Sequence, residues 1–166
     1  MRKMAIDLPK FFENMSKAIT ASLVPLFDRL TGVLYASQDG RLLDAGGLQR
    51  SLQLDLARLF NVRNSLTIQQ YLVCEPSVLY YGLPDTLSLS PYSQLDRELL
   101  ATVLQRCIAM FEPRLSHVQV QVAQDMSKVY GARATIVAAV MLGQQLCQVN
   151  FDVVLDTHSA LIQAAA

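Results

Sequence analysis

An apolar helical pattern ends at the tripeptide Glu112-Pro113-Arg114, and an alternating strand pattern begins directly after it. The apolar positions before the tripeptide recur at helical spacing from Leu95 to Phe111, which predicts a helix with one buried face. Proline has no backbone N–H and disfavours helical geometry at the preceding residue, so the helix must end at Glu112. The chain is therefore expected to turn from helix to sheet at this corner.

The charges at this corner require compensation. A carboxylate at a helix C-terminus faces the negative end of the macrodipole, so Glu112 needs a nearby cation. Arg114 is the nearest candidate, since residues i and i+2 of an extended segment point the same way. The pair is expected to act either as an internal latch or as a docking handle for a partner, and the sequence leaves both interpretations open.

Helical patterns precede the corner and strand patterns follow it. A first helix is predicted over 48–60, with Asp55 and Arg58 paired on its exposed side at three-residue spacing. A second helix is predicted to run to Glu112, with Ser93 and Asp96 at the spacing of an N-terminal capping box. Helices ahead of strands, in a chain of 166 residues, indicate one α+β domain over 22–166, preceded by an N-terminal arm or helix at 1–21.

Three strands are predicted after the corner. Valines alternate with glutamines at 118–122, an apolar run at 133–142 reads as a buried central strand, and alternation returns at 147–155. Short connections between these segments favour an antiparallel meander. We therefore expect helices packed on a small three-stranded, mainly antiparallel sheet at the C-terminal end.

The last predicted strand is expected to offer an open edge. It contains neither proline nor lysine, the residues that commonly prevent an edge from pairing with another chain. An undefended edge suits strand addition by a partner. The alternative is that the N-terminal arm or the C-terminal tail covers this edge. The residues predicted to pair with a partner strand are Gln148, Val149, Asn150, Phe151, Asp152 and Val153.

Composition limits the partners. The formal net charge is zero, so no basic field exists to hold nucleic acid. No apolar run reaches the roughly 18 residues needed to span a bilayer, and charged residues interrupt any signal-peptide core near the N-terminus. Three widely spaced cysteines form neither a disulfide nor a zinc pattern, which favours free thiols in a reducing compartment. A cytoplasmic protein is expected.

No catalytic, cofactor or metal site is predicted. The candidate carboxylates lack the spacing of a hydrolase pair flanking a cleft, and they are Glu75, Asp85, Asp96, Glu98 and Glu112. The two histidines, His117 and His158, are too far apart in the sequence to form a metal site with each other. The chain has no phosphate-binding glycine loop and no nucleophile elbow. We expect a non-enzymatic protein without a small-molecule substrate.

Five segments, in this order, resemble one family over residues 22–156. It comprises the baseplate wedge protein of contractile phage tails together with TssE, the type VI secretion baseplate subunit. The matching segments are Pro25-Leu-Phe-Asp-Arg-Leu-Thr, the stretch from Leu52 to Arg63, Tyr81-Gly-Leu-Pro-Asp, Phe111-Glu-Pro-Arg-Leu, and the terminal pair of strands. The first segment favours the secretion branch over the phage branch.

The resemblance implies a structural subunit of a cytoplasmic baseplate within a membrane-docked secretion complex, without a cofactor. It implies that Glu112, Pro113 and Arg114 contact a wedge core formed by TssF and TssG, beside TssK. It also implies a sheet edge that pairs with the sheath proteins TssB and TssC and starts sheath polymerisation. Two alternatives remain at this point: a lysozyme-like peptidoglycan hydrolase, which these residues do not support, and a general protein-interaction adaptor.

Overall fold

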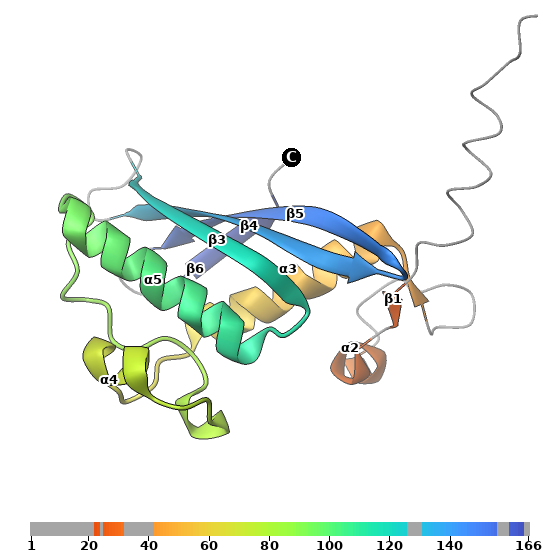
Figure 1. Ribbon diagram of the computed structural model, residues 1–166, viewed down its shortest axis with the longest axis horizontal. Helices are drawn as coiled ribbons and strands as arrows, with labels where there is room; N and C mark the ends of the chain where they lie inside the picture. The colour runs from red at the N-terminus through yellow and green to blue at the C-terminus, as the bar shows by residue number, and fades with distance from the viewer. Residues whose placement is uncertain (1–21, 24, 32–41, 126–130, 156–159, 165–166) are drawn as a thin grey trace, which may run out of the picture. The chain divides into compact units, whose positions relative to one another are not determined.

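A computed structural model describes residues 22–23, 25–31, 42–125, 131–155 and 160–164 (Figure 1). The predicted arm at 1–21 and His158 lie outside these ranges. The chain forms two compact units, each described here by itself. The first contains residues 1–48 and 141–147, and the second contains 49–140 and 148–166.

The first unit has short elements among its described residues. Strand β1 (Ser22–Leu23) pairs antiparallel with β2 (Leu42–Leu43), and a short helix, α2 (Leu26–Thr31), lies between them in the sequence. The longest helix that begins in this unit, α3 (Ala45–Asn61), follows β2. The carboxylate of Asp44 accepts a hydrogen bond of 2.7 Å from the Gly47 amide and so caps the start of α3.

The second unit contains the remaining helices and most of the main sheet, since the end of β4 and the start of β5 fall within residues 141–147 of the first unit. Its other helices are α4 (Ile68–Val73), the 3₁₀ helix η1 (Val78–Tyr80) and α5 (Gln94–Phe111). The strands are β3 (Leu115–Gln124), β4 (Ala132–Leu142), β5 (Gln145–Leu155) and β6 (Ala160–Ala164), in the order β3-β4-β5-β6. The α+β class is confirmed. The sheet has a fourth strand, β6, in the tail, where the sequence predicted none.

Both long helices cover the same face of this sheet (Figure 1). On β4 every second residue is buried, including Ala134, Ile136 and Ala138, as expected for a strand with one face against a core. The buried stripes of the helices supply the other half of the core, which includes Leu52, Leu56, Leu59, Phe60, Leu100, Val103, Leu104, Cys107 and Ile108. The opposite face of the sheet carries the exposed glutamines that the alternation predicted on β3.

Helix α5 has the predicted ends. The Ser93 hydroxyl accepts a hydrogen bond of 3.3 Å from the Asp96 amide, which is the cap expected from the sequence. The last helical hydrogen bond runs from the Glu112 amide to the Ile108 carbonyl at 2.8 Å. The Leu115 amide then donates to the Glu112 carbonyl at 3.1 Å, and β3 begins at Leu115. The chain therefore turns from helix to strand across Pro113 and Arg114.

Candidate functional site

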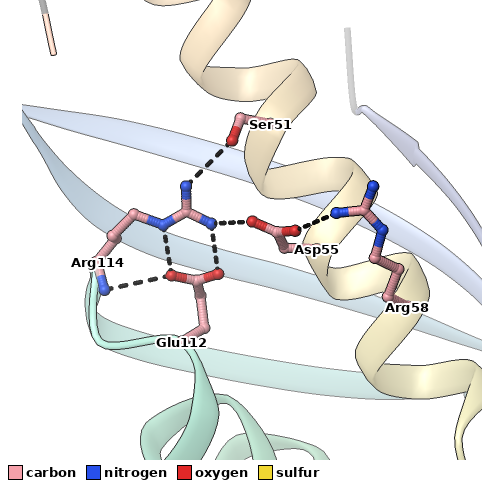
Figure 2. Close-up of polar contacts among 5 residues, drawn as sticks. All are labelled: Ser51, Asp55, Arg58, Glu112 and Arg114. Atoms are coloured by element: carbon pink, nitrogen blue, oxygen red, sulfur yellow. Dashed lines mark hydrogen bonds and ion pairs between the residues drawn. The ribbon is translucent and has the colours of Figure 1, made fainter. Parts of the chain in front are cut away.

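The helix-to-strand corner is held by a two-point ion pair. The Arg114 guanidinium donates from Nε to Glu112 Oε1 and from Nη2 to Glu112 Oε2, each at 2.6 Å. The Arg114 amide adds a longer bond of 3.4 Å to Oε1 (Figure 2). Two parallel N–H to carboxylate bonds fix both distance and orientation. Arg114 thus supplies the cation that a carboxylate at a helix C-terminus requires.

The same guanidinium bonds to helix α3. Arg114 Nη2 donates to Asp55 Oδ2 at 2.6 Å, and Nη1 donates to Ser51 Oγ at 3.1 Å. Asp55 Oδ1 in turn accepts from Arg58 Nη1 at 2.9 Å, the pair that the sequence predicted (Figure 2). These five residues are called the corner cluster below. Its charges alternate from Glu112 through Arg114 and Asp55 to Arg58, and they sum to zero.

Exposure rises steadily along this cluster. The Glu112 side chain is 6% exposed, Arg114 27%, Asp55 29% and Arg58 45%. Burial by itself would lower the pKa of Arg114, but the hydrogen bonds and charges of Glu112 and Asp55 raise it above its usual value. The guanidinium is therefore permanently charged, as its buried acidic partner requires. Along this series of ion pairs, Glu112 is the buried end and Arg58 is the end exposed to solvent.

A hollow of about 290 Å³ lies beside the cluster. Its lining residues are Asp55, Leu59, Tyr81, Phe111, Glu112, Pro113 and Arg114. The rings of Tyr81 and Phe111 meet edge to face, with centroids 5.3 Å apart and planes at 67°, a favoured aromatic arrangement. Tyr81 is 39% exposed and Pro113 is exposed. The corner therefore combines a rigid ion pair with a partly apolar depression that opens to solvent.

The structure brings Glu112 and Arg114 together as expected. It also shows two partners that the sequence did not predict for this corner, Ser51 and Asp55, which are 63 and 59 residues from Arg114. No local pattern could reveal them, because the packing of α3 beside the corner decides the contact. Of the two interpretations of the ion pair, the internal latch is therefore present. The docking role of Glu112, Pro113 and Arg114 stays a prediction.

The residues predicted to pair with a partner strand fall into two groups. Phe151, Asp152 and Val153 lie opposite β6, in the register Phe151↔Ala164, Asp152↔Gln163 and Val153↔Ile162. The preceding segment 148–150 lies on β5 beyond the last β5–β6 pair described. Of the alternatives for this edge, the structure thus has the tail paired with β5 over Phe151–Leu155. The outermost strand on this side, among the described residues, is β6.

The opposite edge of the sheet is irregular. The β3–β4 register shifts between Ser116 and Gln119, where two residues of β3 face one of β4. His117 lies in this bulge, is exposed, and has φ of 51°, a left-handed conformation that costs energy for a residue other than glycine. Gln105 of α5 also donates to the Val118 carbonyl at 2.8 Å. Bulges of this kind hinder edge-to-edge pairing.

Three of the other candidate carboxylates have local structural partners. Asp85 Oδ1 accepts from the Leu87 amide at 2.9 Å, Asp96 Oδ2 accepts from the Ser90 amide at 2.9 Å, and Glu98 accepts from the Gln94 amide group at 2.8 Å. Within the described ranges, no group of three or more potential metal ligands comes together. In the same part of the chain, no helix is both long and apolar enough to cross a membrane.

One family model matches this chain. It is described as baseplate wedge protein gp25 and matches residues 47–145, more than half of the chain. The matched segment includes the whole corner cluster and all the residues that line the hollow. No individual curated relative matches. The family match confirms the resemblance that was identified from the five sequence segments.

Proposed function

Because the chain belongs to the baseplate wedge protein gp25 family and so has a structural role in a baseplate, we propose that it is the wedge subunit of a type VI secretion baseplate. It would dock through Glu112, Pro113 and Arg114 on a core of TssF and TssG, beside TssK. The complex would lie at the cytoplasmic side of the membrane in which the secretion machine is anchored. The phage-tail branch of the family is the alternative setting.

The exposed apex of the corner is the observation that carries the docking proposal. Glu112 is buried and Pro113, the next residue, is exposed. Arg114 is held in one orientation by four of its five N–H groups, two of them on Glu112. A surface held in place before binding loses little conformational entropy when a partner binds. The cluster therefore favours a rigid docking face over a mobile handle.

A co-purification experiment tests this proposal. Wild type, Arg114→Ala and the control Arg133→Ala, which removes an exposed arginine on β4, are each mixed with TssF, TssG and TssK from the same source. Thermal melts first establish the temperature at which every variant is folded. We expect wild type and Arg133→Ala to be captured and folded Arg114→Ala to be lost. Equal capture of all three would leave the cluster as a latch alone, and capture of none would contradict the docking proposal.

We further propose that TssB and TssC begin sheath polymerisation by adding a strand at the β5–β6 side of the sheet. Three features support this side. The β3 edge carries the bulge at His117, segment 148–150 extends beyond the β6 pairing, and β6 contains neither charged residues nor proline. Pairing of a partner strand with Phe151, Asp152 and Val153 would require that strand to take the place of β6.

The variants Gln148→Pro and Val149→Pro test strand addition. Successive residues of an antiparallel strand direct their N–H groups to opposite sides, so one of Gln148 and Val149 faces β4 and the other faces the edge. Proline at the edge-facing position should leave the fold intact and abolish sheath initiation on assembled baseplates, because it removes a donor that a partner strand needs. A folded edge-facing variant that starts sheath at the wild-type rate would exclude pairing at this segment.

A further inference from the structure

The hollow beside the corner has two different walls. One wall is hydrocarbon and aromatic, and comes from Leu59, Tyr81, Phe111 and Pro113. The other wall is the corner cluster, represented in the lining by Asp55, Glu112 and Arg114. The chemical class of a ligand that fits this hollow depends on what each wall leaves unsatisfied.

The carboxylate oxygens of the polar wall already accept hydrogen bonds from arginines of the corner cluster. Each carboxylate oxygen of Glu112 and of Asp55 accepts at least one guanidinium N–H, at distances from 2.6 to 2.9 Å. The two acids and the two arginines balance in charge. An ionised group placed in the hollow would lose hydration without finding an unpaired counter-charge, which is unfavourable. The charges of this wall therefore favour a neutral occupant.

We propose that the hollow is a socket for one large, uncharged, apolar side chain of another baseplate protein. This inference rests on the proposed docking through the corner and specifies what docks there. The volume, about 290 Å³, lies at the lower limit of sites that hold whole small molecules, so it suits a single side chain. The paired rings of Tyr81 and Phe111 offer the kind of surface on which apolar anchors of protein interfaces pack.

Arg58 predicts the charge that the partner carries just outside the socket. It is the most exposed member of the cluster, and only its Nη1 group is bonded to Asp55. Its charge reaches the Tyr81 phenol: burial and then Asp55 raise the pKa of Tyr81, and Arg58 opposes that rise. Arg58 does not itself line the hollow, but it is bonded to Asp55, which does, so it lies just outside the socket. The cluster is neutral as a whole, but among the described residues Arg58 uses only its Nη1 group, so we expect a partner carboxylate outside the socket, beside the apolar anchor, to bind the other N–H groups of Arg58.

Tyr81 provides a matched pair of variants for the apolar wall. Within the described residues its hydroxyl makes no hydrogen bond, so Tyr81→Phe keeps the ring and removes only the hydroxyl. Tyr81→Ala removes the ring. Binding of each purified variant to the TssF–TssG complex is measured by titration after its melting temperature is recorded. We expect Tyr81→Ala to bind at least about 30-fold more weakly, the loss typical of a central interface anchor, and Tyr81→Phe to bind within about twofold of wild type.

A second pair tests the charge at the rim. Arg58→Glu should weaken binding by about 10-fold at low salt, and Arg58→Lys should retain most of it, because a rim charge acts through a screened attraction. Higher salt should weaken wild-type binding and should not weaken Arg58→Glu binding. A further variant, Pro113→Glu, changes an exposed residue and places a charge at the socket. It should also weaken binding, and it tests the socket if Tyr81→Ala is too unstable to measure.

The outcomes separate this inference from the docking proposal. If wild type does not bind TssF–TssG, the docking proposal fails. If wild type binds, and Tyr81→Ala and Pro113→Glu bind equally well, the socket is wrong while docking elsewhere stands. If Tyr81→Phe loses as much affinity as Tyr81→Ala, the partner contacts the hydroxyl, and the apolar occupant is excluded.

Discussion

Arg114 holds the carboxylate of Glu112 in two hydrogen bonds of 2.6 Å, across a turn that separates the two residues by a single proline. The Glu112 side chain is only 6% exposed, and among the described residues the cation that forms an ion pair with it is the Arg114 guanidinium. Because the guanidinium also bonds to Ser51 and Asp55, a single side chain joins the end of α5, the start of β3 and the middle of α3.

Arg114→Ala should destabilise the protein by about 3–5 kcal/mol, because it leaves a buried carboxylate without its counter-ion. The free energy of unfolding from urea titrations at pH 7 measures this loss. Replacing Glu112 as well, in Glu112→Gln with Arg114→Ala, should recover part of the stability, since no buried charge remains. A single-variant loss no larger than that of the control Arg133→Ala would contradict the latch.

Gly82→Ala should unfold or strongly destabilise the second unit. Gly82 has φ of 101°, and a Cβ added there would lie 2.5 Å from the Val62 carbonyl oxygen, a contact with backbone that cannot move aside. The expected loss exceeds about 2 kcal/mol. Gly46→Ala, in helix α3, is the control: its added Cβ would lie 3.8 Å from the nearest atom, Oδ1 of Asp44, so the change should be neutral or slightly stabilising. Melting temperatures of both variants give the comparison.

Stability should fall with rising pH above about 9. Burial raises the pKa of the Cys107 thiol from 9.0 to about 12, so above pH 9 the unfolded chain releases this proton while the folded chain keeps it. The difference costs about 1.4 kcal/mol per pH unit until the pKa of the folded state is reached. Burial also raises the pKa of Tyr71, whose hydroxyl donates to the Gly82 carbonyl at 2.9 Å, and extends the effect to higher pH.

Cys107→Ala isolates the thiol's share of this effect. Unfolding free energies at pH 8, 9 and 10 should decline less steeply for the variant than for wild type, whatever the offset caused by the smaller side chain. The slope decides the result because the cavity costs the same at every pH. Identical slopes would show that the thiol ionises equally easily in both states.

His117→Gly should raise the melting temperature. His117 adopts φ of 51° in the β3 bulge, and glycine takes that conformation without the steric cost, a gain of about 0.5–1 kcal/mol. The imidazole is exposed, so its removal should cost little packing. The control is Gln119→Gly, at the exposed residue just after the bulge. This variant should be less stable than wild type. A lower melting temperature for His117→Gly would contradict a strained backbone here.

Local patterns predicted the two long helices, α3 and α5, and the three long strands, β3, β4 and β5, but not the short elements β1, α2, β2, α4 and η1. Pro113 ended α5 where expected, Ser93 capped its start, and the valines and glutamines of β3 alternate between faces as the sequence indicated. These features depend on residues close in the chain. The tail was different: the segment that forms β6 shows no alternation strong enough to predict, and its pairing with Phe151 through Leu155 supplies the partner hydrogen bonds. The formation of β6 therefore depends on its pairing with β5, and not on a pattern in its own sequence.

The sequence by itself determined the helix-to-strand corner, the α+β class, the need of Glu112 for a cation, and the family. Each of these follows from spacing, from the backbone restrictions of proline, or from motifs in order. Only the tertiary structure decided that Arg114 also bonds to Ser51 and Asp55, and that a hollow lies beside them between Tyr81 and Pro113. Those contacts join segments more than fifty residues apart in the chain, and their geometry depends on how helices pack on the sheet, which no local pattern encodes.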